Sequence, residues 1–304
     1  MMMVEATMDN PWGSGAPRVS IGLPVYNGQA YLGHAVESLL GQTYRDFELI
    51  VSDNASTDGT EAICRTFAKR DGRVRYVRQA HNVGAAENFN RTAELACGEY
   101  FRWAAHDDVC GPRLLERCVE ALDANPRAVL AQGRAAIIDP DEQVIATPDG
   151  QENTELLDPA REMDSVDPAR RFYDLLLQTK WCFEIFGLIR RATLMRTHLH
   201  ESFYGSDKVI LASLCLSGEF ATVPEALFYR RHHPASSTGM KTASQRHAWI
   251  GGDKSRKSAR LQCLNGYARA IREADLSSWT RVRCYGVLGK YVGQFQKWSW
   301  LRAS

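Results

Sequence analysis

Residues 19–53 read VSIGLPVYNGQAYLGHAVESLLGQTYRDFELIVSD. Residues 19–26 are mostly apolar and end at Asn27-Gly28, a pair that favours turns, so they predict a buried strand. Apolar residues then recur at helical spacing between 29 and 40, which predicts an amphipathic helix. Residues 47–52 predict a second buried strand. Two buried strands joined by a helix indicate a parallel βαβ unit.

The same alternation continues to residue 138. We expect strands at 74–78, 100–104 and 128–138, and helices at 58–70, 85–96 and 113–124, the first opened by a capping box of Asp58 and Glu61. This order predicts a mostly parallel sheet covered on both faces. Ligands of such sheets bind beyond the carboxyl ends of the strands. The segments expected there are 24–27, 52–56, 79–84 and 105–108.

The second half begins with an acidic, proline-containing stretch at 139–167, which we interpret as a lid or linker. We then expect a helix at 169–178, a strand at 183–189, a helix at 207–216 capped by Ser206, and an extended segment at 220–229. A polar loop at 230–244 leads to two helical stretches, 245–274 and 278–300.

Composition excludes several classes of protein. The chain has 304 residues, of which 44% are hydrophobic and 24% charged, as in ordinary globular proteins. A formal net charge of +1 gives no general attraction to nucleic acid. No stretch has the length and hydrophobicity of a membrane span. Residues 1–17 lack the apolar core of a secretory signal and are expected to be a disordered leader. The 8 cysteines form no C-x-x-C pair. We therefore expect reduced cysteines and a cytoplasmic protein.

Adjacent carboxylates suggest a metal-assisted reaction on a diphosphate ester. Asp107 and Asp108 follow a predicted strand, and the parallel topology brings Asp53 to the same edge. Mg²⁺ and Mn²⁺ take one or two protein carboxylates and leave room for substrate phosphates. Two adjacent aspartates also occur in solvated turns and helix caps, which is the alternative interpretation. The sequence has neither G-x-G-x-x-G nor G-x-x-x-x-G-K-[ST], which disfavours a Rossmann dinucleotide enzyme and a P-loop phosphotransferase.

An ordered set of motifs resembles the inverting nucleotide-sugar glycosyltransferases of family two. The motifs lie at 24–27, 42–51, 53–60, 82–84, 98–100, 107–108, 205–207 and 229–232, so the resemblance covers about residues 18–237. It implies a GT-A fold, an α/β three-layer sandwich, with a C-terminal helical extension. It also implies a catalytic domain at 18–244, with a nucleotide-binding half at 18–138 and an acceptor half at 139–244, followed by a helical region at 245–304.

The resemblance also implies roles for individual residues. Tyr26 and Asp53 match the pair that contacts the nucleobase, and Pro24 lies where the backbone approaches the base. Asp207 matches the catalytic base that takes the proton of the acceptor hydroxyl. The remaining expected donor contacts are Asn27, Asn82, Asp107, Arg230 and Arg231, and the expected acceptor contacts are Trp181 and Glu184. Each has a plain structural alternative: a turn, a helix N-terminus or aromatic packing.

Two positions depart from the family pattern. Ala105 stands where the first aspartate of the metal motif is expected, so that Asp107 aligns with the second, and Ser206 replaces the glutamate before Asp207. The resemblance implies Mn²⁺ or Mg²⁺ as cofactor. The candidate metal ligands are Asp107, Asp108, His232 and His233, with His106 as a further substitute.

The expected function is metal-dependent, inverting transfer of a hexose-type sugar from a nucleoside-diphosphate sugar, with a UDP-sugar favoured, to an acceptor hydroxyl. The acceptor stays open among a sugar, a lipid carrier and a small metabolite. Two alternatives remain: a sugar nucleotidyltransferase, and a nucleotide-sugar-binding protein without turnover. Two further possibilities stay open: a homo-oligomer, and peripheral contact with the inner face of a membrane. The membrane contact is suggested by Trp298 and Trp300, which lie among basic residues, as in interfacial helices.

Overall fold

The computed structural model describes residues 15–147, 157, 161–234, 236, 240, 242–251 and 258–294. Its centre is a nine-stranded sheet with the order β3-β2-β1-β4-β8-β6-β9-β5, and β7 pairs with β6. Strands β1 to β4 run parallel, β8 runs antiparallel to both of its neighbours, and β6 and β9 pair in parallel. The sheet is therefore parallel in its nucleotide half, as the sequence predicts, and mixed beyond β4.

The first half contains the predicted alternation of strands and helices. The elements are β1 (Val19–Val25), α1 (Leu32–Leu40), β2 (Phe47–Asp53), α2 (Thr60–Arg70), β3 (Val74–Arg78), α3 (Ala85–Leu95), β4 (Tyr100–Trp103), β5 (Val109–Cys110), α4 (Leu114–Ala124), β6 (Ala128–Ile138) and β7 (Val144–Ala146).

The second half is mainly helical. It contains α5 (Pro168–Leu177), the 3-10 helix η2 (Phe183–Phe186), β8 (Leu188–Arg190), α6 (Arg191–Leu194), α7 (Ser206–Ser217), β9 (Glu219–Arg231), α8 (Ala243–Ile250), α9 (Ala259–Glu273) and α10 (Ser278–Gly293).

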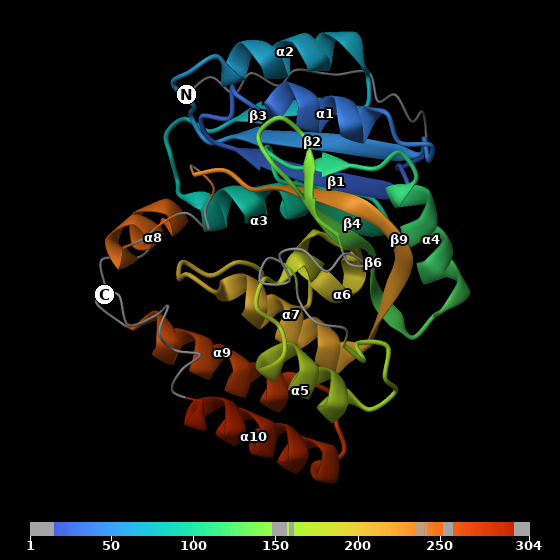
Figure 1. Cartoon of the computed structure of the whole chain (residues 1–304), viewed down its shortest axis with the longest axis vertical. Helices are drawn as coiled ribbons and strands as arrows, with labels where there is room; N and C mark the ends of the chain where they lie inside the picture. Colours follow the sequence, from blue (N-terminus) through green and yellow to red (C-terminus); the bar gives the residue numbers. More distant parts are fainter. Residues whose placement is uncertain are drawn as a thin grey trace.

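Helices cover both faces of the sheet, which makes the molecule a three-layer α/β structure. In β1, Val19, Ile21 and Leu23 all point to the face covered by α1, α2 and α4. In β4, Phe101 and Trp103 point to the other face, where α3, α5, α7, α9 and α10 pack. The alternation follows from the two-residue period of a strand. Figure 1 shows α1 and α2 at one end of the molecule and α10 at the other.

Several local expectations were wrong. The predicted strand at 183–189 is η2 followed by the short β8, and β5 and β7 were not predicted. Glu61 and Asp58 form no capping box, because the N-cap of α2 is Gly59. Ser206 is the first residue of α7 and not its cap, because Gly205 takes the N-cap position with φ 98°. The predicted helix at 245–274 is interrupted, because α8 ends at Gly251 in the left-handed conformation.

The two C-terminal helices belong to the main core. Cys263, Tyr267 and Ile271 of α9 and Val287 and Tyr291 of α10 are buried in the same cluster as α5 and α7. All eight cysteines are free, and all of them except Cys97 are buried. Within the described ranges, no helix is long and apolar enough to cross a membrane. The predicted leader at 1–17 and Trp298 and Trp300 lie wholly or mostly outside the described residues.

Candidate active site

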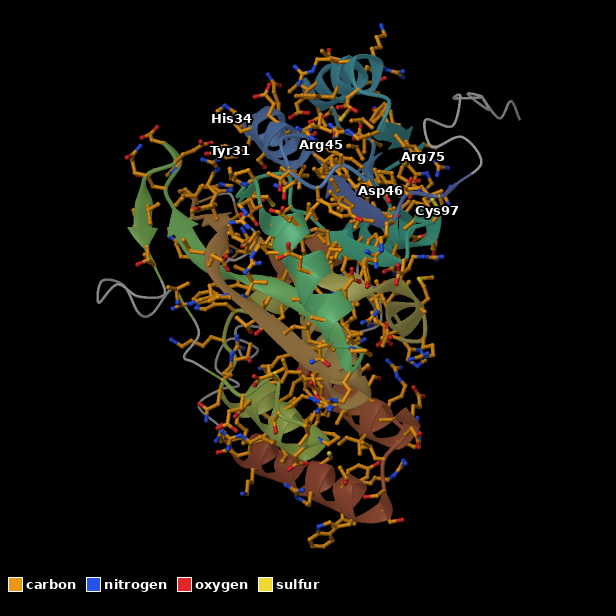
Figure 2. The ribbon with its side chains drawn as sticks, turned by 90° about the vertical axis from the view of Figure 1, so that its right-hand side faces the viewer. Tyr31, His34, Arg45, Asp46, Arg75 and Cys97 are labelled. Atoms are coloured by element: carbon orange, nitrogen blue, oxygen red, sulfur yellow. The ribbon has the colours of Figure 1, made fainter. Side chains whose placement is uncertain are left out.

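The carboxyl ends of β1, β2 and β4 lie side by side, because β1 pairs in parallel with both of the other strands. Figure 2 shows Tyr31 and His34, which follow β1, on the opposite side of the molecule from Asp46, Arg75 and Cys97, which lie near the amino ends of strands. Of the residues predicted to be functional, Tyr26, Asp53 and Asp107 follow or end these three strands.

The loop after β1 presents Tyr26 to solvent. Its side chain is 44% exposed, whereas Pro24 is buried within β1. Asn27 takes a left-handed φ of 51°, and its Oδ1 accepts a hydrogen bond from the Thr57 amide at 2.8 Å. A Cβ on Gly28 would lie 2.7 Å from Cδ2 of His106, so only glycine fits there. These contacts fix an exposed aromatic ring at the end of β1.

Asp53 lies at the end of β2 and is fully buried. Its Oδ1 accepts from the Ser56 amide at 2.8 Å, and its Oδ2 accepts from the Tyr76 hydroxyl at 2.8 Å and from Arg78 Nη1 at 3.0 Å. Arg78 also donates to the Ser56 carbonyl at 3.0 Å. Asp53 therefore organises the loop and the Arg78 guanidinium, and Arg78 is the more exposed member of the pair.

Asn82 braces the loop after β3. Its Oδ1 accepts from Asn54 Nδ2 at 2.9 Å and from the Gly84 amide at 2.8 Å. Gly84 has a φ of +87° and packs against Gly251, at the end of α8. A Cβ on Gly84 would lie 2.3 Å from Cα of Gly251, so this contact requires two glycines. The end of α8 is thereby held against the nucleotide half of the protein.

Asp107 meets a histidine from the far end of β9. Nε2 of His233 lies 3.0 Å from Oδ2 of Asp107, although 126 positions separate the two residues in the chain. His233 is 8% exposed, and its ring lies 4.9 Å from the ring of Tyr31. The neighbouring His232 is exposed and contacts β6 through its backbone amide. Of the two predicted histidines, the structure brings only His233 to the aspartate.

Asp108 points away from solvent and supports the backbone. Its Oδ1 accepts from the Arg231 amide at 2.9 Å. The Arg231 guanidinium donates to the Asp107 and Pro140 carbonyls at 2.8 and 3.0 Å, and to Glu142 at 2.8 Å. Because its Nε, Nη1 and Nη2 all bond protein acceptors, this geometry favours a structural role for Arg231 over the predicted contact with a donor diphosphate.

The two adjacent aspartates have opposite pKa shifts. Burial, together with the charge of Asp107, raises the pKa of Asp108 to about 8. Burial also disfavours ionisation of Asp107, but the hydrogen bond to His233 and the charges of His106 and His233 outweigh it and lower its pKa. At neutral pH, Asp107 is therefore the ionised member of the pair, and Asp108 is largely protonated.

Asp107 and His233 are the residues that could hold a divalent cation, together with oxygens of a substrate. In this structure Oδ2 and Nε2 lie 3.0 Å apart and form a hydrogen bond. In the part of the chain that the structure describes, no group of three or more His, Cys, Asp or Glu side chains forms a metal cluster. Phosphate oxygens would have to complete such a site, as is common for Mg²⁺.

Asp207 lies in the first turn of α7, and its Oδ1 accepts from the Lys208 amide at 2.8 Å. Burial raises the pKa of this carboxyl. Ser206 beside it is buried, and its Oγ lies 3.3 Å from Nδ1 of His200. The His200 ring packs against Phe89 and Trp103 at 5.0 and 4.8 Å. A carboxylate whose pKa is raised is a stronger base than an exposed aspartate.

Comparison with known proteins identifies the family. The family model described as "Glycosyl transferase family 2" matches residues 20–201, which is more than half of the chain. The chain belongs to glycosyltransferase family 2. A curated relative of this glycosyltransferase is the GalNAc(5)-diNAcBac-PP-undecaprenol beta-1,3-glucosyltransferase of Campylobacter jejuni, which is 26% identical over 65% of the chain. The aligned part makes up 60% of the length of that relative.

Solved structures confirm that the glycosyltransferase has the GT-A type of α/β fold. S. aureus TarS 1-349 in complex with UDP superposes with a TM-score of 0.64 at 16% identity, over 93% of this chain and 72% of that chain. The mannosyltransferase PcManGT from Pyrobaculum calidifontis, in complex with GDP-Man and Mn²⁺, superposes with a TM-score of 0.54 at 17% identity, over 92% and 76% of the two chains. The predicted fold class and family are therefore confirmed.

The predicted acceptor contacts differ in accessibility. Trp181 stacks on Phe183 with ring centroids 6.5 Å apart, and the buried Arg230 guanidinium lies 5.4 Å from the Phe183 ring. Glu184 is fully buried and forms an ion pair with Arg161. The glycosyltransferase thus offers Trp181, which is partly exposed, at this surface, whereas Glu184 is out of reach of an acceptor in this structure.

Sequence reasoning missed several residues of the site. Arg78 pairs in register with Asp53, so an alignment of the predicted strands at 47–52 and 74–78 could have found it. No sequence pattern pointed to Tyr31, Glu142 or His200. Each lies in a loop or at the start of a helix, where strand pairing does not fix its neighbours. The Tyr31 ring packs at a tilt against His233 and lies 4.7 Å from the Arg231 guanidinium, and Glu142 bonds Arg231 and His34.

Proposed function

We propose that this glycosyltransferase transfers a sugar from a nucleoside-diphosphate sugar to an acceptor hydroxyl with inversion, in a reaction that depends on a divalent cation. The observation that carries the proposal is the contact of Asp107 with His233, on the same edge of the sheet as Tyr26 and Asp53. Mn²⁺ in the complex of PcManGT supports a metal, and UDP in the complex of TarS supports a uridine nucleotide.

The nucleotide would bind across the ends of β1 and β2. The exposed ring of Tyr26 provides a surface on which a base can stack. The Arg78 guanidinium bonds Asp53, the Ser56 carbonyl and Glu61, so in this arrangement it holds the loop in shape. Besides bonding the Ser56 amide and Arg78, Asp53 accepts the Tyr76 hydroxyl and so orients that ring. Asn27 and Asn82 then act by holding their loops in shape, since their side-chain oxygens accept backbone amides.

The diphosphate would lie over Asp107 and His233. A divalent cation bound there would neutralise the charge that develops on the leaving diphosphate. Asp107 is suited to hold it because it is ionised at neutral pH, whereas Asp108 keeps its proton and supports the Arg231 backbone. Arg230, the other predicted donor contact, packs against Trp181 and Phe183.

Asp207 is the proposed base. A carboxylate must take the proton of the acceptor hydroxyl as that oxygen attacks the anomeric carbon from the side opposite the diphosphate. The raised pKa of Asp207 makes it a stronger base than an exposed aspartate. A single displacement of this kind inverts the anomeric configuration. The acceptor proposed on the basis of the Campylobacter relative is a lipid-linked sugar, which would bring the enzyme to a membrane surface.

One experiment separates this function from its two alternatives. The purified protein is incubated with a UDP-sugar, with and without Mn²⁺, and the products are followed by NMR. Metal-dependent release of UDP with the opposite anomeric configuration in the sugar supports the proposal, and retention of configuration contradicts it. Binding of the UDP-sugar without any turnover, even with a panel of lipid-linked acceptors, indicates a binding protein. Formation of nucleotide sugar from UTP and a sugar 1-phosphate indicates a nucleotidyltransferase.

A further inference from the structure

A buried arginine lies apart from the site described above. Arg102 of β4 is 2% exposed and is among the largest fully buried side chains. Its Nη1 donates to Sγ of Cys110 at 3.4 Å, and sulfur is a weak acceptor. Within the described part of the chain, Nε and Nη2 have no hydrogen-bond partner, and no carboxylate forms an ion pair with this guanidinium.

Arg102 lines a small cavity between the sheet and α4. The other lining groups are mostly apolar, with Leu114, Leu115 and Cys118 from α4 and Phe183 and Phe228 from the opposite side. The amide side chain of Gln132 is the second polar group of the lining. The space between them has room for one water-sized or monatomic group and no more.

The neighbouring groups do not balance the charge of Arg102. Arginine keeps its proton in proteins, so it cannot become neutral as a buried lysine can. Burial raises the pKa of the Cys110 and Cys118 thiols, the latter to about 12, so both are uncharged at neutral pH. The nearby Asp108 accepts the Arg231 amide and forms no ion pair with Arg102 among the described residues. A buried, unbalanced charge costs several kcal/mol.

We propose that Arg102 and this cavity form a binding site for a small monovalent anion of the size of chloride. A water molecule could accept the free N–H groups, but it would leave the positive charge uncompensated. A phosphate or sulfate ion would be too large for the cavity and would bring more negative charge than one guanidinium balances. A single chloride meets both requirements, and it would hold β4 against α4 next to the loop that carries Asp107.

The test is the melting temperature of the full chain as chloride replaces gluconate at constant ionic strength. Gluconate is too large for the cavity, so it provides the anion-free reference. Because a ligand that binds only the folded state stabilises it, we expect the melting temperature to rise by about 3 °C or more between 1 and 150 mM chloride, with a logarithmic dependence. An unchanged melting temperature of the wild type overturns the proposal.

Two variants locate the effect. Arg102→Met removes the charge and should abolish the chloride response, and we expect this variant to be at least as stable as the wild type in gluconate. Arg171→Met is the matched control, because Arg171 is equally buried but donates to the Cys215 and Ser165 carbonyls. Arg171→Met should keep the chloride response even though it lowers the melting temperature. An equal response in Arg102→Met contradicts the assignment.

A direct measurement covers the case in which Arg102→Met does not fold. Crystals of the wild-type protein grown in bromide are measured at the bromine absorption edge. An anomalous peak within hydrogen-bond distance of Nε or Nη2 of Arg102 supports the site. A map in which Arg102 is well ordered and no peak lies beside it overturns the proposal.

Discussion

The first turn of α7 gives the sharpest prediction for a single residue. Asp207→Asn keeps the side-chain oxygen that accepts the Lys208 amide but removes the basic carboxylate. We expect transfer to fall by about 10²- to 10⁴-fold, while nucleotide binding is retained. Initial rates with a donor and an acceptor measure the transfer, and calorimetry with UDP and Mn²⁺ measures the nucleotide binding.

Asp167→Asn is the matched control for Asp207→Asn. Asp167 is the N-cap of α5 and accepts the Ala169 amide, so it stands at a helix start without facing the site. Its replacement by asparagine, which caps equally well, should leave kcat nearly unchanged. A kcat of more than about a tenth of the wild-type value in Asp207→Asn would remove Asp207 from the role of base.

Two adjacent histidines allow a test of the metal site. His233→Ala removes a group that lies 3.0 Å from Asp107 and should weaken Mn²⁺-dependent binding of UDP by at least about tenfold. His232→Ala is the control, since His232 is exposed and uses its backbone amide in the sheet. The binding constants come from calorimetric titration. If both variants bind like the wild type, His233 is not a ligand.

His200 should make the stability of the protein depend on pH. Burial lowers its pKa to about 3, so the unfolded chain, with a pKa of about 6.5, takes up the proton first. The stabilisation is complete above about pH 6.5 and is lost as the pH falls towards 3, by about 1.4 kcal/mol per pH unit. His200→Gln, which cannot titrate, should lack this loss.

The measurement for His200 is the difference in free energy of unfolding between wild type and variant, from urea titrations at several pH values. Parallel pH profiles of the two proteins would contradict the lowered pKa. His81→Gln, at an exposed position, serves as the control and should follow the wild type.

For single residues, the sequence predicted which side chains belong to the site better than it predicted which groups those side chains contact. The motifs brought Asp107 and Asp53 to the correct edge, because the alternation of strands and helices dictates which strand ends meet. They did not distinguish His232 from His233, because adjacent residues point to opposite faces at the end of a strand. They also could not show that Asp53 is saturated by Ser56, Tyr76 and Arg78, since those contacts depend on the fold of three loops.

Among the elements, α8 depends on one contact between glycines. Gly84→Ala would place a Cβ 2.3 Å from Cα of Gly251 at a φ of +87°, so we expect a loss of about 1–3 kcal/mol in the free energy of unfolding. Hydrogen exchange of the amides in α8 should become faster. Gly33→Ala, in α1 with open space around it, is the control and should be neutral or stabilising. Unchanged exchange in α8 would show that the contact does not hold this helix.

Most elements of the first half were predicted correctly, including the short strands β3 and β4, but the two shortest strands were missed. β1, β2 and β6 and helices α3 and α4 lie within about two residues of their expected bounds. β5 has two residues and β7 has three, which is too short for a pattern to form. The segment at 183–189 has the composition of a buried strand, but Cys182 takes a left-handed conformation and starts η2, and tertiary packing thus overrides local preference.

For the whole molecule, the shared core predicts cooperative unfolding. The sequence predicts a C-terminal helical region at 245–304, and its helices α9 and α10 bury their apolar faces against α5 and α7. We expect one calorimetric transition, with equal calorimetric and van't Hoff enthalpies. Two resolved transitions would show that the C-terminal helices form an independent unit.

The fold class as a whole could be predicted from the sequence because its first half repeats one simple unit. The mixed part of the sheet could not be predicted from the sequence. The order of β8, β6 and β9 depends on long connections, to which the right-handed crossover rule for parallel strands gives no guide. The sequence also did not indicate that Nε and Nη2 of Arg102 would be buried without a hydrogen-bond partner, since an arginine in a strand is normally expected to reach solvent.

The separation of Asp107 and His233 along the chain has a consequence for biosynthesis. A ribosome that adds about 5–20 residues per second needs roughly 6–25 seconds to proceed from one residue to the other. During that interval the strands β1 to β4 are already outside or near the exit of the ribosome, but the histidine has not been made. A nascent chain is therefore unable to form the Asp107–His233 pair until translation has passed β9.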